Sequence, residues 1–222
     1  MSRVLFIGVA ALAMGLAGAP AFSQRIDVDI HDDESAVGQP MLFVSGGGNN
    51  SLRDFQDDND DDLDIGSELQ TGFNVGGGLG IQFNRWAALR ATYNFARSQG
   101  EGGTFSPLAG NHFNRHYYGA DLQFRGDTAG FSPYLAIGGG AVTVSPDDDA
   151  LLLSPAGAQF SNESFTKPAG KLGLGFDYQF PNTGFGIFAE GSGWVYKWDR
   201  YGLDRTQVDT NWGAGLTYRF GY

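Results

Sequence analysis

The sequence predicts an all-β fold, an eight-stranded antiparallel up-and-down transmembrane β-barrel. Three observations lead to this prediction. Apolar residues alternate with polar residues or glycine in repeated segments, tight and long connections alternate between those segments, and the charges within the segments lie on the polar face. Alternation with a period of two is typical of a strand with one apolar face. A chain of 222 residues is long enough for one barrel of this kind.

Residues 1–21 predict an export signal. Arg3 precedes an apolar stretch from Val4 to Leu16, and Ala19 and Ala21 form the small-x-small pattern of a cleavage site. The alternative is a transmembrane anchor, but the apolar stretch is shorter than the roughly 20 residues that a spanning helix needs. We therefore expect cleavage after Ala21, then a flexible acidic segment over residues 22–39 and the barrel over residues 40–222.

Alternating segments follow one another along the rest of the chain. In one of them, Phe73, Val75 and Leu79 are interleaved with Asn74 and Gly78. The clear segments are 73–83, 89–95, 118–124, 172–180 and 212–222, and weaker ones lie at about 40–48, 131–144 and 185–197. For the segment 131–144 the sequence leaves open which face is which.

The connections between these segments alternate strictly in length. Tight turns are expected at 84–86, 126–130 and 181–184, and long polar loops at about 49–69, 98–112, 145–166 and 198–210. Short turns at one rim and long loops at the other are typical of outer-membrane barrels. Strands of roughly 9–15 residues also reach across an apolar band of ~25 Å when they are tilted.

Charge placement separates a membrane barrel from a soluble one. A soluble lipocalin-like or streptavidin-like barrel would turn its apolar face inward. Here the charged residues lie on the face opposite the apolar one, so they would point into the barrel. The interior of an eight-stranded barrel is just wide enough for side chains. An unbroken apolar outer face would aggregate in water. The pattern therefore favours a transmembrane barrel with an interior of glycine, amides and paired charges.

The last strand resembles the C-terminal assembly signal of Gram-negative outer-membrane proteins, in which apolar residues alternate up to a terminal aromatic residue. The residues that carry this resemblance are Trp212, Leu216, Tyr218, Phe220 and Tyr222. Together with segments 132–140 and 171–180, the chain resembles the OmpA-like, opacity-type family of small outer-membrane barrels over about residues 40–222. The resemblance implies a bacterial outer-membrane location, contact with membrane lipid and lipopolysaccharide, and insertion by the barrel assembly machinery. One departure from the family pattern is that this sequence ends with the barrel, whereas a peptidoglycan-binding domain follows the barrel in OmpA itself, so we do not expect this chain to anchor the cell wall.

Five charged residues of the polar face are expected to form one ionic layer in the lumen: Arg90, Asp121, Asp177, Glu190 and Arg219. Counted from the short turns, they lie at similar heights, which predicts the pairs Arg90–Asp121 and Glu190–Arg219. Asp177 is expected to share Arg219 or to be partly protonated. A buried charge is costly without a partner, so the layer is interpreted as an ionic plug.

The first long loop is strongly acidic and is the one candidate metal site. Its carboxylates include Asp57, Asp58, Asp60, Asp62 and Asp64. The EF-hand pattern fails here, because Asp62 stands where the sharp turn needs glycine. Weak Ca²⁺ or Mg²⁺ binding is the remaining hypothesis, with a solvated acidic loop as the alternative. No other cofactor is expected.

We expect millimolar Ca²⁺ or Mg²⁺ to order this acidic loop, because neighbouring carboxylates repel one another unless a hard cation bridges them. The loop's NMR resonances or its protease sensitivity should change on titration at constant ionic strength. No change in either would contradict the hypothesis.

Composition limits the function classes. A formal net charge of −11 argues against a nucleic-acid partner, and the absence of cysteine excludes disulfides and thiolate-ligated metals. The histidines are His31, His112 and His116. The sequence has no His-x-Ser pair of the kind that a lipid hydrolase in such a barrel would need. Ser106 lies in the same predicted loop as His112, but nothing in the sequence fixes the two side chains together. We expect a non-enzymatic monomer that acts structurally or through its long loops. A narrow, porin-like passive channel and a lipid-modifying enzyme are the alternatives.

Overall fold

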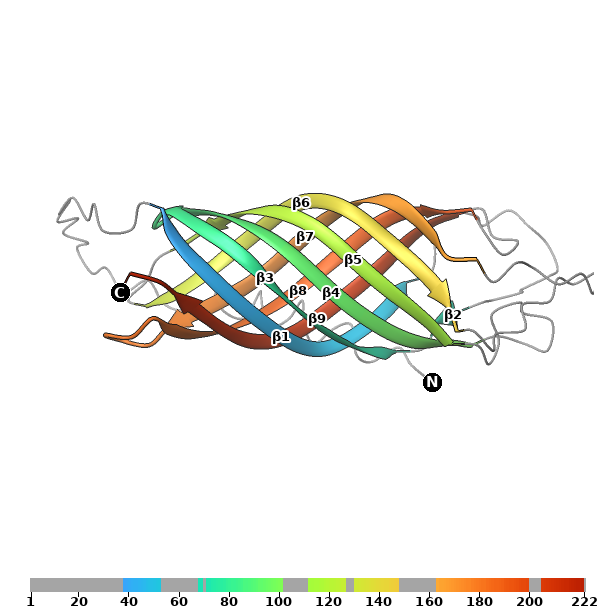
Figure 1. Ribbon diagram of the computed structural model, residues 1–222, viewed down its shortest axis with the longest axis horizontal. Coiled ribbons are helices and arrows are strands. Elements are labelled where there is room, and N and C mark those ends of the chain that lie inside the picture. Colours follow the sequence, from blue (N-terminus) through green and yellow to red (C-terminus); the bar gives the residue numbers. More distant parts are fainter. Residues whose placement is uncertain are drawn as a thin grey trace, which may run out of the picture. The chain divides into compact units, whose positions relative to one another are not determined.

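Eight long antiparallel strands close into a barrel in the computed structural model (Figure 1). The structure describes residues 38–52, 68–69, 71–101, 112–126, 130–147, 163–199 and 205–221. The strands are β1 (Gln39–Leu52), β3 (Gly72–Asn84), β4 (Ala87–Glu101), β5 (His112–Arg125), β6 (Phe131–Pro146), β7 (Phe165–Gln179), β8 (Phe185–Trp198) and β9 (Arg205–Arg219), and the two-residue strand β2 is Glu68–Leu69. The predicted eight-stranded barrel is confirmed.

Closure of the barrel depends on β1, the first strand, which pairs with β3 on one side and with the last strand, β9, on the other. Each remaining strand pairs with its neighbours in sequence, and β2 pairs with the end of β4. Because every long strand has two partners, the sheet that these eight strands form has no open edge. No helix in the described ranges is long and apolar enough to cross a bilayer.

The strands run further toward the long loops than the sequence predicted. β9 begins at Arg205 and β5 at His112, within segments that were expected to be loops. In these extensions outward residues are polar, as at Thr166 and Thr206. The apolar alternation that marks a lipid-facing strand is lost there, while backbone pairing continues.

The outer face carries the apolar half of the alternation. Leu79, Leu172 and Leu174 are each about 60% exposed, which suits a surface in contact with lipid. Outward aromatic residues gather near the short turns (Phe83, Trp86, Phe124, Phe131, Phe176, Phe180, Phe185 and Phe220) and again toward the long loops (Phe73, Tyr93, Tyr118 and Trp212). Two aromatic girdles on either side of an aliphatic band are typical of outer-membrane barrels.

The facing of β6, which the sequence left open, is now settled. Phe131 and Ile137 point outward and are 39% and 48% exposed, whereas Tyr134, Ala136 and Val142 are buried inside. Tyr134 fits in the lumen because Gly175 lies opposite: a Cβ atom there would stand 2.5 Å from the Tyr134 ring. Inward glycine therefore gives large side chains from neighbouring strands room to cross the lumen.

Candidate functional site in the barrel lumen

A middle layer of the lumen joins four charged side chains from four strands. Arg90 on β4 donates to both carboxylate oxygens of Asp121 on β5, at 2.8 and 3.1 Å, and to Glu190 Oε2 on β8 at 2.7 Å. Lys171 Nζ on β7 lies 2.6 Å from Asp121 and 3.1 Å from Glu190. The Tyr134 hydroxyl donates to Glu190 at 3.0 Å. The layer is a closed ring of two cations and two carboxylates.

The predicted pair Arg90–Asp121 is present, whereas the predicted pair Glu190–Arg219 is wrong. Glu190 contacts Arg90 and Lys171 instead. Glu190 faces Gly213 across the β8–β9 pair, and Arg219 lies six residues further along β9, which is roughly 20 Å at ~3.3 Å per residue. The five residues therefore do not share one layer.

A lower layer, near the short turns, forms around Asp177 on β7. Arg125 Nη2 donates to Asp177 Oδ1 at 2.7 Å, and Arg219 Nη2 donates to Asp177 Oδ2 at 2.6 Å. Arg219 also donates to the side-chain oxygen of Gln179. The expected contact between Asp177 and Arg219 is present, but the second partner of Asp177 is Arg125, which was not in the predicted layer.

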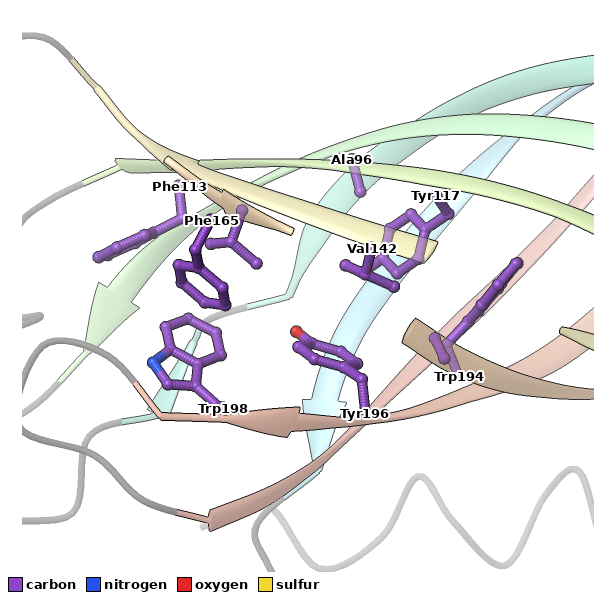
Figure 2. Close-up of a cluster of buried hydrophobic side chains, with 10 residues drawn as sticks. Ala96, Phe113, Tyr117, Val142, Phe165, Trp194, Tyr196 and Trp198 are labelled. Atoms are coloured by element: carbon purple, nitrogen blue, oxygen red, sulfur yellow. The ribbon is translucent and has the colours of Figure 1, made fainter. Parts of the chain in front are cut away.

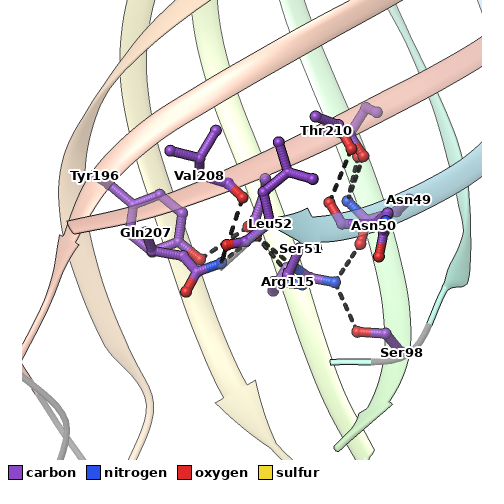
Figure 3. A network of polar contacts seen from close by, with 12 residues as sticks. Asn49, Asn50, Ser51, Leu52, Ser98, Arg115, Tyr196, Gln207, Val208 and Thr210 are labelled. Carbon is purple, nitrogen blue, oxygen red and sulfur yellow. Dashed lines mark hydrogen bonds and ion pairs between the residues drawn. The ribbon is translucent and has the colours of Figure 1, made fainter. Parts of the chain in front are cut away.

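An upper layer, toward the long loops, was missed by sequence reasoning (Figure 3). Arg115 on β5 lies 2.8 Å from Asp209 on β9, and both side chains are fully buried. Asp209 also accepts hydrogen bonds from the hydroxyls of Tyr117 at 2.7 Å and Tyr196 at 2.8 Å. Arg115 donates further to Ser51 and Ser98, at 2.5 and 2.6 Å, and to the Asn49 side chain.

The upper half of the lumen is also filled by aromatic side chains, contrary to the expectation of a wholly polar interior (Figure 2). The buried cluster consists of Ala96, Phe113, Tyr117, Val142, Val144, Phe165, Ala169, Trp194, Tyr196 and Trp198. Ring centroids lie 5.4 Å apart for Tyr117–Trp194 and for Phe165–Trp198. Lys171 Nζ lies 5.8 Å from the centre of the Trp194 ring, so the cluster adjoins the middle layer.

Small cavities separate the layers. One of about 40 Å³ lies above the middle layer and is lined by Arg90, Lys171 and Glu190 together with Ser, Thr and Asn side chains, including Asn211. Another of about 10 Å³ lies between the middle and lower layers. About 10–15 Å³ is enough for one water molecule, so the lumen holds a few water-sized spaces among packed side chains.

The remaining predicted site residues lie elsewhere. The acidic-loop residues Asp57, Asp58, Asp60, Asp62 and Asp64, as well as His31 and Ser106, are outside the described residues. Within the described ranges, no group of three or more His, Asp or Glu side chains could hold a metal ion. His112 is exposed at the start of β5, and His116 Nδ1 lies 2.9 Å from the Tyr93 hydroxyl on the outer wall.

The residues of the predicted assembly signal lie on the lipid-facing side of the barrel end. Trp212, Leu216 and Phe220 are 55%, 57% and 42% exposed. Tyr218 packs against Phe185 and Phe220, at centroid distances of 4.8 and 4.9 Å. Tyr222 is outside the described residues. Their role in assembly stays a prediction.

Comparison with known proteins points to one family. A family model described as an outer membrane protein beta-barrel domain matches residues 9–220. No curated protein matches the chain. The crystal structure of Neisserial surface protein A is similar, with 14% identity, coverage of 82% of this chain and 97% of that chain, and a TM-score of 0.55.

Two further solved barrels are similar at lower TM-scores. One is the attachment invasion locus protein Ail of Yersinia pestis, in complex with the heparin analogue sucrose octasulfate, with 20% identity, coverage of 83% and 99%, and a TM-score of 0.47. The other is OprG of Pseudomonas aeruginosa, with 17% identity, coverage of 84% and 98%, and a TM-score of 0.46. At 14% identity, the likeness to Neisserial surface protein A concerns the fold alone.

Proposed function

Because the chain belongs to the outer membrane β-barrel family and is therefore a bacterial outer-membrane protein, we propose that it is a non-conducting barrel that acts structurally and through its long loops. One observation carries the proposal: the lumen is crossed at three levels by paired charges and, in its upper half, by a buried aromatic cluster. Each layer joins strands from different sides of the barrel, so that the layers stiffen the wall while they fill the interior.

On this proposal the protein is a monomer, with outer-membrane lipid and lipopolysaccharide against its wall and no enzymatic activity. The four longest connections join strands at the rim above the aromatic cluster, where they would face the outside of the cell. A filled lumen leaves these loops as the part that can recognise a partner.

A narrow passive channel is the second candidate, and the two cavities favour it. They lie on either side of the middle layer and share Phe43, Arg90 and Phe188 in their linings. If the ring of Arg90, Asp121, Lys171 and Glu190 opened, the cavities would join. The middle layer is therefore the element on which the choice between plug and channel depends.

Conductance of the purified protein in planar lipid bilayers tests both candidates. The wild-type chain should give no steps above the lipid baseline, whereas Glu190→Gln should give small steps, because Arg90 and Lys171 then share one carboxylate instead of two. Asp147→Asn is the matched control, since its pair with Arg97 is exposed at the rim. Regular wild-type steps would favour the channel.

The loop part of the proposal has its own test. Proteinase K added to intact cells should cleave within residues 53–67, 102–111 or 148–162 and leave the short turn at 181–184 intact. Cleavage that needs a permeabilised outer membrane would place the long loops on the periplasmic side and would overturn the proposed orientation.

A further inference from the structure

The lower layer carries more positive than negative charge. Arg125 and Arg219 share Asp177, which is the one carboxylate that either of them contacts among the described residues. All three side chains are buried, with exposed fractions of 6% for each arginine and 3% for Asp177. The middle layer has two cations and two carboxylates, and the upper layer pairs Arg115 with Asp209. The excess of one positive charge is therefore confined to the lower layer.

The same region has buried hydrogen-bond donors without partners. Nε of Arg125, Nε of Arg219 and the hydroxyl of Thr217 make no hydrogen bond within the described chain. Buried donors are nearly always paired in folded proteins, either with protein atoms or with a bound water or ion. Three unpaired donors around one carboxylate indicate that a further acceptor belongs here.

A cavity adjoins two of these three donor side chains, Arg125 and Thr217. It has a volume of about 10 Å³ and is lined by Arg90, Arg125, Asp177 and Thr217, with Tyr134 and Phe188 among the other residues. A space of this size admits about one water-sized particle. Arg90 in this lining is balanced by the carboxylates of the middle layer, whereas Arg125 and Arg219 carry two positive charges against the one negative charge of Asp177. The field of the lower layer therefore attracts an anion and repels a cation.

We propose that this cavity is a binding site for one small monovalent anion of halide size. Such an ion accepts hydrogen bonds from several donors at once and balances the excess charge of the lower layer. A water molecule would satisfy a donor but leave the charge uncompensated, and a phosphate or sulfate exceeds the space. The proposal goes beyond the proposed function, because the site exists whether or not the lumen conducts.

Bromide is the probe for the decisive experiment, since it replaces chloride and scatters anomalously. Crystals of the full chain grown in sodium bromide should show an anomalous peak in the cavity beside Arg125 and Thr217. Thr217→Val, which removes one donor at nearly constant volume, should lose most of the peak. Thr92→Val is the matched control, because Thr92 lines the other lumen cavity, and it should keep the peak.

Thermal unfolding gives a second readout. At ten times the dissociation constant, sodium chloride should raise the unfolding midpoint by about 3–5 °C relative to sodium gluconate at equal ionic strength. The rise should saturate and should be absent in Thr217→Val. Absence of a bromide peak in the wild type overturns the proposal, whether or not the valine variant folds. A second result also overturns it: the bromide peak is unchanged in Thr217→Val, and the unfolding midpoints in chloride and gluconate are equal. This result would indicate an adventitious ion only.

Discussion

Asp209→Asn is expected to destabilise the barrel by about 3–5 kcal/mol, because it leaves the buried Arg115 guanidinium without a counter-charge. Asp209 and Arg115 are both fully buried and lie 2.8 Å apart. Asparagine keeps the shape of the side chain, so the loss reports charge pairing rather than packing. The measurement is the free energy of unfolding in urea for protein refolded into lipid vesicles, compared with the wild type.

The exposed pair at the rim supplies the control for this prediction. Arg97 and Asp147 lie 2.5 Å apart, but their side chains are 40% and 41% exposed, and exposed pairs contribute up to about 1 kcal/mol. Asp147→Asn should therefore have a small effect. The double variant Arg115→Met with Asp209→Leu should recover much of the stability lost in Asp209→Asn, since it leaves no unpaired charge. Equal losses in Asp209→Asn and Asp147→Asn would contradict the prediction.

In the clearly alternating segments, the outer face of the barrel could be predicted from the sequence residue by residue, whereas the facing of segment 131–144 could not. Contact with lipid requires an apolar side chain at every second position, so Leu172, Leu174 and Phe176 mark the outward face of β7 without further information. The number of strands could be predicted from the same alternation of residues and from the way in which tight turns and long loops alternate along the chain. The prediction weakened where outward residues face water, as in the first residues of β9.

Pairing inside the lumen was harder to predict, because it depends on relative strand heights. Arg90 and Asp121 can both be counted from a tight turn, and their pair was predicted. Arg219 lies near the end of β9, where no short turn follows from which its height in the barrel could be counted. Its backbone N–H donates to Gly184 O at 2.8 Å, which places Arg219 at the rim, far below Glu190.

The residues of the upper layer and of the aromatic cluster do alternate in the sequence, but this alternation did not show which residues face the lumen and which face the lipid. Gln207, Asp209 and Asn211 continue the inward alternation of β9 into a segment that was expected to be a loop. Trp194 and Trp198 also alternate with outward residues, Val195 and Lys197. A large apolar residue at every second position is typical of the lipid face elsewhere in this chain, so periodicity alone could not assign these tryptophans to the lumen.

Trp194→Ala is expected to destabilise the barrel by about 3–5 kcal/mol, the usual cost of truncating a large buried aromatic side chain. Trp194 is fully buried, and its ring lies over Gly119, where a Cβ atom would stand 2.7 Å from the indole. Trp194 thus occupies the space that Gly119 leaves free, and Gly119 has no side chain that could fill this space after the truncation. The free energy of unfolding in urea measures the loss.

The same variant should also raise conductance in planar bilayers. The Trp194 ring lies beside Lys171, which lines the cavity of about 40 Å³. Removing the indole therefore extends a polar cavity into the aromatic cluster, where water can then enter. Trp86→Ala is the matched control, because Trp86 is 51% exposed and lines neither cavity; it should lose less stability and stay closed. If Trp194→Ala is as stable and as closed as the wild type, the aromatic cluster does not seal the upper lumen, and the charged layers alone would have to close it.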